Sequence, residues 1–186
     1  MKIVIGISGA SGSVLGVSLL KALQGFAEAE THLVVSRLGW QTLVYETGLA
    51  EDDVKSLAQH NYAADNMFAP IASGSFAADG MIICPCSMKT VAGICSGFSD
   101  NLLLRAADCC LKENKPLVLV PREMPLSKLH LRNLSAAAEL GCAIIPPVLT
   151  FYNHPRQVED HIDHIIGKIL AQFGLCYSNF RPWEGE

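Results

Sequence analysis

Short runs of aliphatic residues recur along the chain and predict the strands of a sheet. The runs cover residues 3–7, 32–35, 81–84, 117–120 and 143–145, and a further short strand is expected around residues 62–68. They lack a clean alternation of polar and apolar positions, which is typical of parallel strands covered by helices on both faces.

Helical patterns separate these runs and cover residues 13–24, 39–47, 52–59, 87–95, 101–112, 127–139 and 155–173. Ser87 and Ser127 are suited to cap the helices that they precede, and Pro155 suits a first helical turn. The alternation of strands and helices predicts an α/β fold: a three-layer αβα Rossmann-like (flavodoxin-like) domain with a mostly parallel sheet.

Length and charge narrow the class of protein. The chain has 186 residues, of which 50% are hydrophobic, which is enough for one sizeable core and too short for two full domains. We expect one domain over residues 1–174 and a tail over residues 175–186. A net charge of -4 argues against nucleic-acid binding, because no basic excess neutralises phosphates. No apolar run is long enough to span a bilayer and no charged leader precedes the first strand, so a cytoplasmic protein without a membrane partner is expected.

The spacing of cysteine and histidine gives little sign of a disulfide framework or a metal site. The seven cysteines form no pair of Cys-x-x-Cys motifs, so most are expected to be small buried apolar side chains. His161 and His164 lie beside Asp160 and Asp163 with a metal-like spacing, but a solvated helix face is the favoured interpretation. We therefore expect no metal.

The loop Gly6-Ile7-Ser8-Gly9-Ala10-Ser11-Gly12 has the composition of a phosphate-binding turn. Its glycines allow a sharp turn close to an anion, while Ser8 and Ser11 place hydroxyls beside the amides that open the next helix. It is not the dinucleotide fingerprint, because Ser8 holds a place where that pattern requires glycine. A plain strand-to-helix turn is an equal alternative for this segment alone, and its position after the first strand favours a ligand site.

Other polar clusters also follow predicted strands. Ser36 follows the second strand, residues 86–90 follow the fourth, and Arg122 and Glu123 follow the fifth. Ligands of open parallel sheets bind beyond the carboxyl ends of the strands, so these clusters predict a site at one edge of the sheet. The small-residue, apolar segment 67–76 is expected to fold over the same edge.

Several charged and aromatic residues have both a chemical and a structural interpretation. Arg122 can hold a phosphate in a forked contact and Glu123 can transfer a proton, whereas a local ion pair between them is the structural alternative. Lys112 closes a helix, where a lysine is usually solvated. Arg105 is either an interior cation or a partner in an ion pair within its helix. Tyr152 either donates to a ligand or covers the core.

Eight motifs occur together in order along the chain: Gly-Ile-Ser-Gly-Ala-Ser-Gly from Gly6, Ala-Ser-Gly-Ser-Phe from Ala72, Pro-Cys-Ser-Met-Lys-Thr from Pro85, Arg-Ala-Ala-Asp from Arg105, Leu-Lys-Glu from Leu111, Pro-Arg-Glu-Met-Pro-Leu-Ser from Pro121, Pro-Pro from Pro146 and Phe-Tyr-Asn-His-Pro from Phe151. With them the chain resembles the UbiX-type flavin prenyltransferases, a family formerly described as aromatic acid decarboxylase partner proteins. The similarity runs from about residue 1 to residue 174 and includes the ending Arg-Pro-Trp-Glu-Gly from Arg181.

The resemblance implies binding of FMN and transfer of a dimethylallyl group from dimethylallyl monophosphate to N5 and C6 of the reduced flavin. The prenylated FMN would serve a separate UbiD-type decarboxylase. The flavin contacts implied are Gly9, Ala10, Ser11, Ser36, Ser87, Met88, Lys89, Thr90 and Arg122. The residues implied around the prenyl phosphate are Ser73, Arg105, Lys112, Glu123, Tyr152 and Lys168. The catalytic residues implied are Ser11, Glu46, Lys112 and Glu123.

The family forms large oligomers, typically homo-dodecamers, so part of the pocket would come from neighbouring subunits. Cations around the leaving phosphate would make a metal unnecessary, Glu123 would handle the proton, and the apolar segment 67–70 would exclude water. Lys168 stands where many members carry Arg and Met67 where many carry Trp, which removes a planar fork and an aromatic face. Two alternatives therefore stay open: a flavin-dependent cysteine decarboxylase, whose Asn-containing motif is missing from residues 70–75, and a non-catalytic FMN-binding subunit.

Overall fold

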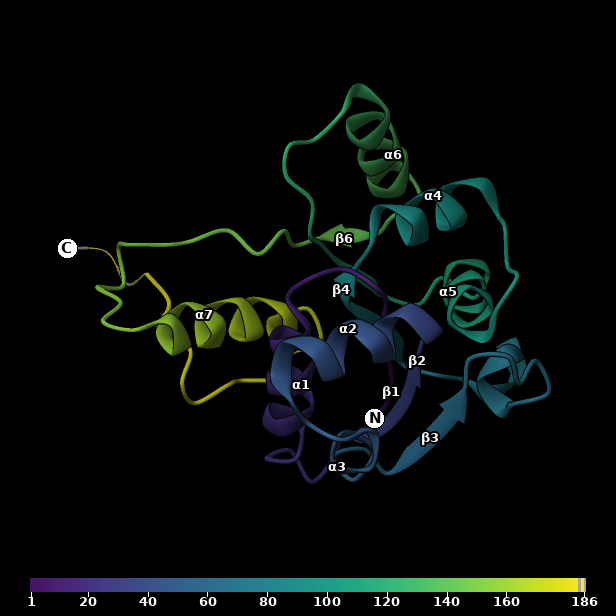
Figure 1. Ribbon diagram of the computed structural model, residues 1–186, viewed down its shortest axis with the longest axis horizontal. Coiled ribbons are helices and arrows are strands. Elements are labelled where there is room, and N and C mark those ends of the chain that lie inside the picture. The colour runs from purple at the N-terminus through teal and green to yellow at the C-terminus, as the bar shows by residue number, and fades with distance from the viewer. Residues whose placement is uncertain (184, 186) are drawn as a thin grey trace.

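A parallel six-stranded sheet forms the centre of the protein, as a computed structural model that describes residues 1–183 and 185 shows (Figure 1). The strands are β1 (Lys2–Ile7), β2 (Glu30–Val35), β3 (His60–Ala63), β4 (Gly80–Cys86), β5 (Leu117–Pro121) and β6 (Ala143–Ile144). They lie in the order β3-β2-β1-β4-β5-β6, and each pairs in parallel with its neighbours. This is the strand order of a Rossmann sheet, in which the order reverses beside β1.

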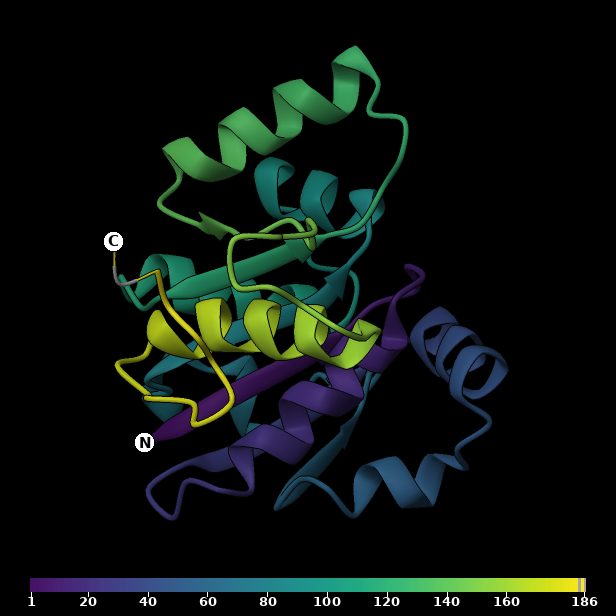
Figure 2. The same ribbon diagram turned by 90° about the vertical axis from the view of Figure 1, so that its left-hand side faces the viewer.

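Helices cover both faces of this sheet (Figure 2). They are α1 (Ser13–Leu23), α2 (Arg37–Thr47), α3 (Glu51–Lys55), α4 (Met88–Ser96), α5 (Leu102–Lys112), α6 (Lys128–Glu139) and α7 (Val158–Ala171), with short 3₁₀ turns η1 (Pro70–Ala72) and η2 (Gly74–Phe76). Ile3, Ile5 and Ile7 of β1 pack into one core cluster with α1, α2, α3 and α7. Val4 belongs to a second cluster with α4, α5 and α6. Because adjacent strand residues point to opposite faces, one apolar strand supplies both cores, and the expected three-layer α/β fold is confirmed.

Several predicted boundaries were wrong, including the end of the strand expected over residues 62–68, and polar side chains explain the shifts at α2, α3 and α7. Helix α3 ends at Lys55 and β3 starts at His60, because the Gln59 side chain accepts a hydrogen bond from the Thr31 amide at 2.8 Å and draws the chain into the sheet. Helix α7 starts at Val158, so Pro155 lies outside it; the Asp160 carboxylate caps the helix by accepting from the amides of residues 156 and 157. Helix α2 starts before the expected Gly39, because the Ser36 hydroxyl accepts from the Gly39 amide.

The predicted helix caps at Ser87 and Ser127 and the burial of most cysteines were confirmed. Ser87 and Ser127 each accept a hydrogen bond from an amide of the helix that follows, at 3.3 Å and 3.1 Å. All seven cysteines are free thiols, and Cys84, Cys86, Cys109, Cys110 and Cys142 are buried. Burial raises the pKa of Cys110 to about 12. In the described part of the chain, no helix has the length and apolar character needed to cross a bilayer.

The segment that links β3 to β4 follows a path opposite to the one expected. It leaves β3 where the Leu102 amide donates to the Ala64 carbonyl, and it ends where the Asp79 amide donates to the Lys2 carbonyl. The segment thus runs beside α5 back to the amino ends of the strands instead of folding over their carboxyl ends. The physical reason is that β4 is parallel to β3, so the chain must return to the amino edge before β4 begins.

The tail after residue 174 packs on α7. Phe180 contacts the helix at Gly167, where a Cβ would collide with the phenyl ring, and Tyr177 donates to Asp163 at 2.8 Å. The predicted tail includes Glu184 and Glu186, which lie outside the described residues. The division of the chain at residue 174 stays a prediction.

The contact between α1 and β4 generates a stability prediction. Gly16→Ala places a Cβ 2.6 Å from the Cys84 carbonyl oxygen, so the helix must move away from the sheet. We expect a loss of about 1–3 kcal/mol in the free energy of unfolding, measured by urea denaturation at fixed protein concentration. Gly25→Ala is the control, since the nearest atom there is the Ala22 carbonyl oxygen at 3.3 Å and the site is exposed. Equal losses in both variants would contradict the close approach.

Candidate functional site

Four loops meet at the carboxyl edge of the sheet, as expected from the sequence. Residues 8–12 follow β1, Ser36 follows β2, Ser87 follows β4, and Arg122 with Glu123 follows β5. Figure 2 shows the loop between β1 and α1 protruding at this edge beside α2. Gly9 permits that approach, because a Cβ there would lie 2.6 Å from Leu38 Cβ.

Two side chains fasten the first loop to its neighbours. The buried Ser8 hydroxyl donates to the Pro85 carbonyl at 3.0 Å and accepts from the Ser87 amide at 2.7 Å. Arg122 Nε donates to the Ser11 carbonyl at 3.2 Å. Ser8 is therefore a link between β1 and β4, and the expectation that its hydroxyl faces an anion was wrong.

Glu46 of α2 caps the start of α1. Its Oε2 accepts from the Gly12 amide at 2.9 Å and from the Ser13 amide at 2.8 Å. Partial burial raises the pKa of Glu46, but hydrogen bonds from the Ser11 hydroxyl and the two amides outweigh burial and hold the pKa below its ordinary value. A phosphate at these two amides was the expectation for this loop. The Glu46 carboxylate occupies these two amides, so the prediction that the amides at the start of α1 face a bound phosphate was wrong.

The start of α4 offers a second set of donors at the same edge. Ser87 Oγ lies 3.0 Å from Thr90 Oγ1 and accepts from the Thr90 amide, while Lys89 is exposed beside them. Hydroxyls, first-turn amides and a lysine at a helix N-terminus suit an anion such as the phosphate of FMN. The Met88 side chain is buried in the core, so a ligand can meet this residue only through its backbone.

Exposed apolar side chains lie next to these donors. Val14, Leu38 and Met124 are large hydrophobic residues with at least 44% of their surface exposed, and each adjoins a carboxyl-edge loop. A ligand with a flat aromatic ring and an anionic tail fits such a surface, because the ring covers apolar side chains while hydroxyls and cations hold the tail. The residues present at this edge therefore fit FMN.

Glu123 and Arg122 do not pair with each other in the described chain. Glu123 is exposed and its Oε1 accepts from the Met124 amide at 3.1 Å, whereas Arg122 reaches back to the first loop. The structural alternative of a local ion pair was therefore wrong. Glu123 keeps a free carboxylate oxygen at the edge where the loops meet.

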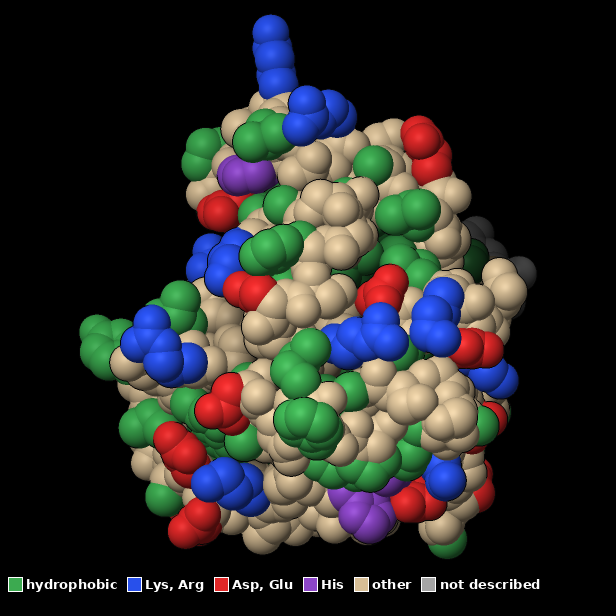
Figure 3. All heavy atoms as spheres, turned by 90° about the vertical axis from the view of Figure 1, so that its right-hand side faces the viewer, with side chains coloured by type: hydrophobic (Ala, Val, Ile, Leu, Met, Phe, Trp, Pro, Cys, Tyr) green, Lys and Arg blue, Asp and Glu red, His purple; other side chains and the backbone are tan. Residues whose placement is uncertain are grey.

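A second group of expected site residues lies on α5 and next to η2: Arg105 is in the first turns of α5, and Lys112 and Ser73 lie nearer the amino edge. Arg105 donates to the Ala72 carbonyl at 2.9 Å and pairs with Asp108 at 2.5 Å, so the ion pair within its helix is confirmed. Lys112 donates to Glu113 at 2.8 Å, and that hydrogen bond raises the pKa of Lys112. Ser73 lines a cavity of about 100 Å³ close to this pair. Figure 3 shows basic and acidic side chains adjoining one another on this face.

A third group lies on the opposite face of the sheet, beside α7. The Tyr152 hydroxyl lies 3.3 Å from His164 Nε2, and Lys168 is one helical turn after His164, with its Nζ 5.6 Å from the centre of the Phe180 ring. In Figure 1, α7 and α5 lie at opposite sides of the molecule. Within a single chain these residues therefore do not meet at one edge, and the expectation that neighbouring subunits supply part of the pocket stays a prediction.

The predicted solvated face of α7 was partly wrong, and one polar cluster was missed. His164 is buried and its ring packs against Tyr152, while Asp163 accepts from Tyr177. The group of possible metal ligands that the described residues do bring together is Glu30, His32 and His60. The alternation of Glu30 and His32 along a strand was a usable signal, but the pairing with His60 depends on strand register.

The capping role of Glu46 generates a pH-dependent prediction. Glu46→Gln should lower the free energy of unfolding by about 1 kcal/mol at neutral pH, because it removes a carboxylate from a helix N-terminus. The pKa of Glu46 is lowered on folding, so its stabilisation is complete above the ordinary pKa of 4.5 and is lost as pH falls through the lower folded value. Urea denaturation at neutral pH and below about pH 4 measures this. The exposed Glu28→Gln is the control. A loss of stability in Glu46→Gln that is the same at both pH values would contradict the capping role of the Glu46 carboxylate.

Comparisons with known proteins identify the family of this chain. The flavoprotein family model matches residues 1–171. A protein of Sedimentibacter hydroxybenzoicus named "Probable UbiX-like flavin prenyltransferase" is 59% identical over 185 residues, covering 100% of this chain and 98% of the relative.

Two solved structures share the fold throughout. The dodecameric FMN-dependent UbiX-like decarboxylase of Escherichia coli O157:H7 is 49% identical with a TM-score of 0.98, covering 100% of both chains. A UbiX protein, AnUbiX, in complex with FMN and dimethylallyl pyrophosphate is 46% identical with a TM-score of 0.97, covering 100% of this chain and 98% of the other. The chain belongs to the UbiX-like flavin prenyltransferases.

Proposed function

We propose that this protein is a flavin prenyltransferase that joins the dimethylallyl group of dimethylallyl monophosphate to N5 and C6 of reduced FMN. The product, prenylated FMN, is then used by a separate UbiD-type decarboxylase. The observation that carries the proposal is the match, at a TM-score of 0.97 over the whole chain, to a relative in complex with FMN and dimethylallyl pyrophosphate. The free thiols agree with a cytoplasmic location, where a reducing environment keeps cysteines unpaired.

FMN binds at the carboxyl edge in this proposal. The start of α4, with Ser87, Lys89 and Thr90, holds the phosphate of FMN together with Ser36 and Arg122. Gly9, Ala10 and the backbone of Met88 lie along the flavin. Ser11 and Glu46 lie at its edge, where the carboxylate orders the serine hydroxyl by accepting its proton in a hydrogen bond.

The prenyl phosphate binds where subunits meet. Within one chain, Lys112 and Ser73 lie at the amino edge and Tyr152 and Lys168 lie on the α7 side, so neither pair reaches Glu123. A relative with 49% identity is dodecameric, and we infer a homo-dodecamer here. In that assembly, neighbouring copies supply Ser73, Arg105, Lys112, Tyr152 and Lys168 to the carboxyl edge of each chain.

The residue types suit departure of a phosphate. Breaking an allylic carbon–oxygen bond leaves negative charge on the phosphate, and Lys112, Lys168 and the tyrosine hydroxyl stabilise that charge without a metal. Reduced FMN supplies the electron-rich ring that accepts the prenyl group. In this proposal Glu123, an exposed carboxylate that follows β5, takes the proton that leaves C6. Met67 and Phe68 are exposed in the single chain, so they exclude water only when another subunit covers them.

The two alternative functions make different predictions for the same chain. A cysteine decarboxylase needs the Asn-containing motif that residues 70–75 lack. A non-catalytic FMN-binding subunit would leave the cationic residues of α5 and α7 without a ligand. The reaction itself separates these possibilities from the proposed one.

The direct test is incubation of the protein with reduced FMN and dimethylallyl monophosphate, followed by mass spectrometry of the released flavin. A gain of one prenyl unit is expected. A parallel incubation with dimethylallyl pyrophosphate identifies the preferred donor. Unchanged flavin mass with both donors would favour the storage function, and carbon dioxide release from a cysteine peptide would favour the decarboxylase.

Glu123→Gln should bind FMN with wild-type affinity but form prenylated FMN at least about 100-fold more slowly, because it removes the proposed proton acceptor. Flavin fluorescence measures the binding, and the flavin mass measures the reaction. Glu139→Gln, an exposed carboxylate on α6, is the matched control and should react normally. Full activity of Glu123→Gln would show that another group takes the proton.

The shared site predicts recovery of activity in mixed oligomers. Lys112→Ala and Glu123→Gln are each expected to be inactive alone. When the two variants are co-assembled in equal amounts, about a quarter of the sites should be active. Those sites receive Lys112 from a Glu123→Gln copy and Glu123 from a Lys112→Ala copy. Ser11→Ala mixed with Glu123→Gln is the control, since both residues belong to the same edge of one chain. No recovery in the first mixture would place Lys112 and Glu123 in one subunit's site.

A further inference from the structure

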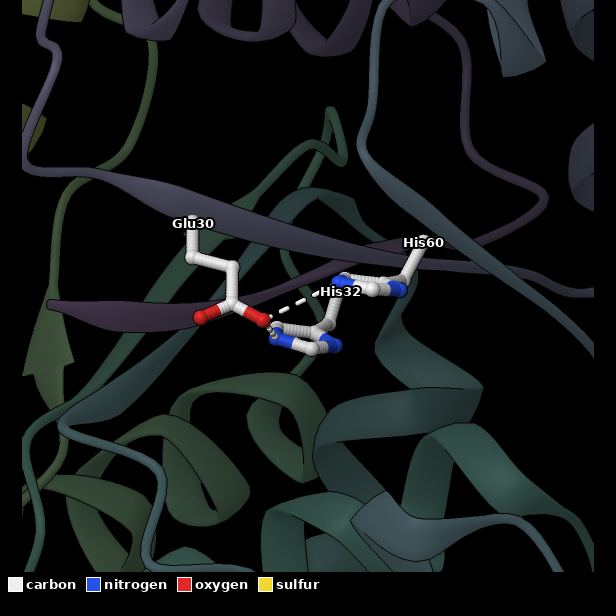
Figure 4. Close-up of side chains that lie close together, drawn as sticks. All are labelled: Glu30, His32 and His60. Atoms are coloured by element: carbon white, nitrogen blue, oxygen red, sulfur yellow. Dashed lines mark hydrogen bonds and ion pairs between the residues drawn. The ribbon is translucent and has the colours of Figure 1, made fainter.

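One glutamate and two histidines meet at the amino end of the sheet, away from the carboxyl-edge loops. Glu30 and His32 are two residues apart on β2, so their side chains lie on the same face. The parallel register places His60 of β3 directly beside His32. Figure 4 shows the three side chains close together, with the Glu30 carboxylate directed at both imidazoles.

The distances between the possible ligand atoms suit a small divalent cation. Glu30 Oε1 lies 2.9 Å from His60 Nε2 and 3.3 Å from His32 Nε2. One ligand atom from each residue lies within 4.8 Å of the other two. Tetrahedral Zn²⁺ binds imidazole nitrogen and carboxylate oxygen at about 2.0–2.2 Å, which sets neighbouring ligand atoms about 3.3 Å apart. Both carboxylate-to-imidazole distances are close to that separation.

A hydrogen bond on the far ring nitrogen fixes the orientation of His32, as is usual for a metal-binding histidine. Its side chain is 2% exposed, and Nδ1 lies 3.0 Å from the Tyr62 hydroxyl. When Nδ1–H donates to Tyr62, the lone pair remains on Nε2. This atom is buried and lies 3.3 Å from Glu30 Oε1, without the geometry of a hydrogen bond to any described residue. A partner on the far ring nitrogen is the usual support of a metal-binding histidine. Burial and the nearby His60 lower the pKa of His32, while Glu30 acts in the opposite direction.

Coordination of one ion by both histidines requires the His60 ring to turn. The two imidazoles are stacked with centroids 4.5 Å apart and 9° between their planes, so their lone pairs run side by side. The His60 side chain is 47% exposed, and rotation about its side-chain bonds directs Nε2 toward the point that Glu30 and His32 face. The neighbouring cation, Lys2, has its Nζ over the Phe76 ring, 4.8 Å from the centroid.

We propose that Glu30, His32 and His60 bind Zn²⁺, with water in a fourth position open to solvent. Two imidazoles and one carboxylate are ligands that zinc accepts, whereas Ca²⁺ and Mg²⁺ prefer oxygen alone. The ion ties β3, a four-residue strand at the end of the sheet, to β2. None of the three residues belongs to the proposed flavin or prenyl sites, so zinc binding stabilises the fold and is independent of the reaction.

The test is calorimetric titration of ZnCl₂ into the FMN-loaded full-length protein. One zinc ion per chain is expected. His60→Ala is the main variant, because this exposed side chain can be removed without opening the core, and it should weaken zinc binding at least about tenfold. With free zinc at about 100 times Kd, the wild-type Tm should rise by about 5 °C or more, and the rise should be lost in His60→Ala and in Glu30→Gln.

The matched control is His130→Gln, which removes an imidazole of α6 outside the cluster and should leave both zinc affinity and the zinc-induced rise in Tm unchanged. Co²⁺ in place of zinc should give the visible bands of a tetrahedral site without a thiolate band, which distinguishes this cluster from the exposed Cys176. Equal zinc affinity in the wild type and His60→Ala, a thiolate band, or no binding by the wild type would overturn the proposal.

Discussion

The parallel direction of all strands is the constraint on which the rest of the structure depends. Each connection must return the chain to the amino edge before the next strand begins. The segments that leave the strands therefore gather Ser11, Ser87 and Arg122 at the carboxyl edge. The return connection to β4 carries Ser73, and helix α5, which returns the chain to β5, carries Lys112 toward the amino edge. A single chain thus presents parts of the proposed site at two edges, and assembly of several chains is needed to join them.

The carboxyl edge is held in shape by polar contacts that leave other donors free. Glu46 fills the N-terminus of α1, Ser8 joins the exits of β1 and β4, and Arg122 holds the first loop. Hydrogen bonds to charged groups of this kind are stronger than neutral ones, so they fix the loops firmly. At the start of α4, the Ser87 amide donates to Ser8 and the Thr90 amide donates to Ser87. The exposed Lys89 and the other first-turn amides are the groups that remain to meet an anion there.

Exposed apolar side chains agree with a protein that functions as an oligomer. Tyr45 on α2, Phe68 in the β3–β4 connection and Phe151 before α7 are all largely exposed. Contact with another subunit would remove this apolar surface from water. Phe68 and Phe151 belong to the same two segments as Ser73 and Tyr152, so contacts between subunits would also position the residues of the shared pocket.

The sequence by itself determined the fold class, the helix caps at Ser87 and Ser127, and the family, because buried parallel strands and ordered motifs leave local signals. It did not determine the path of residues 64–79, the capping of α1 by Glu46, or the meeting of His32 with His60. Those features join residues that lie far apart in the sequence, and they arise from strand register and helix packing. Only the tertiary structure could decide them, because a local pattern carries no information about which distant backbone or side chain lies across the contact.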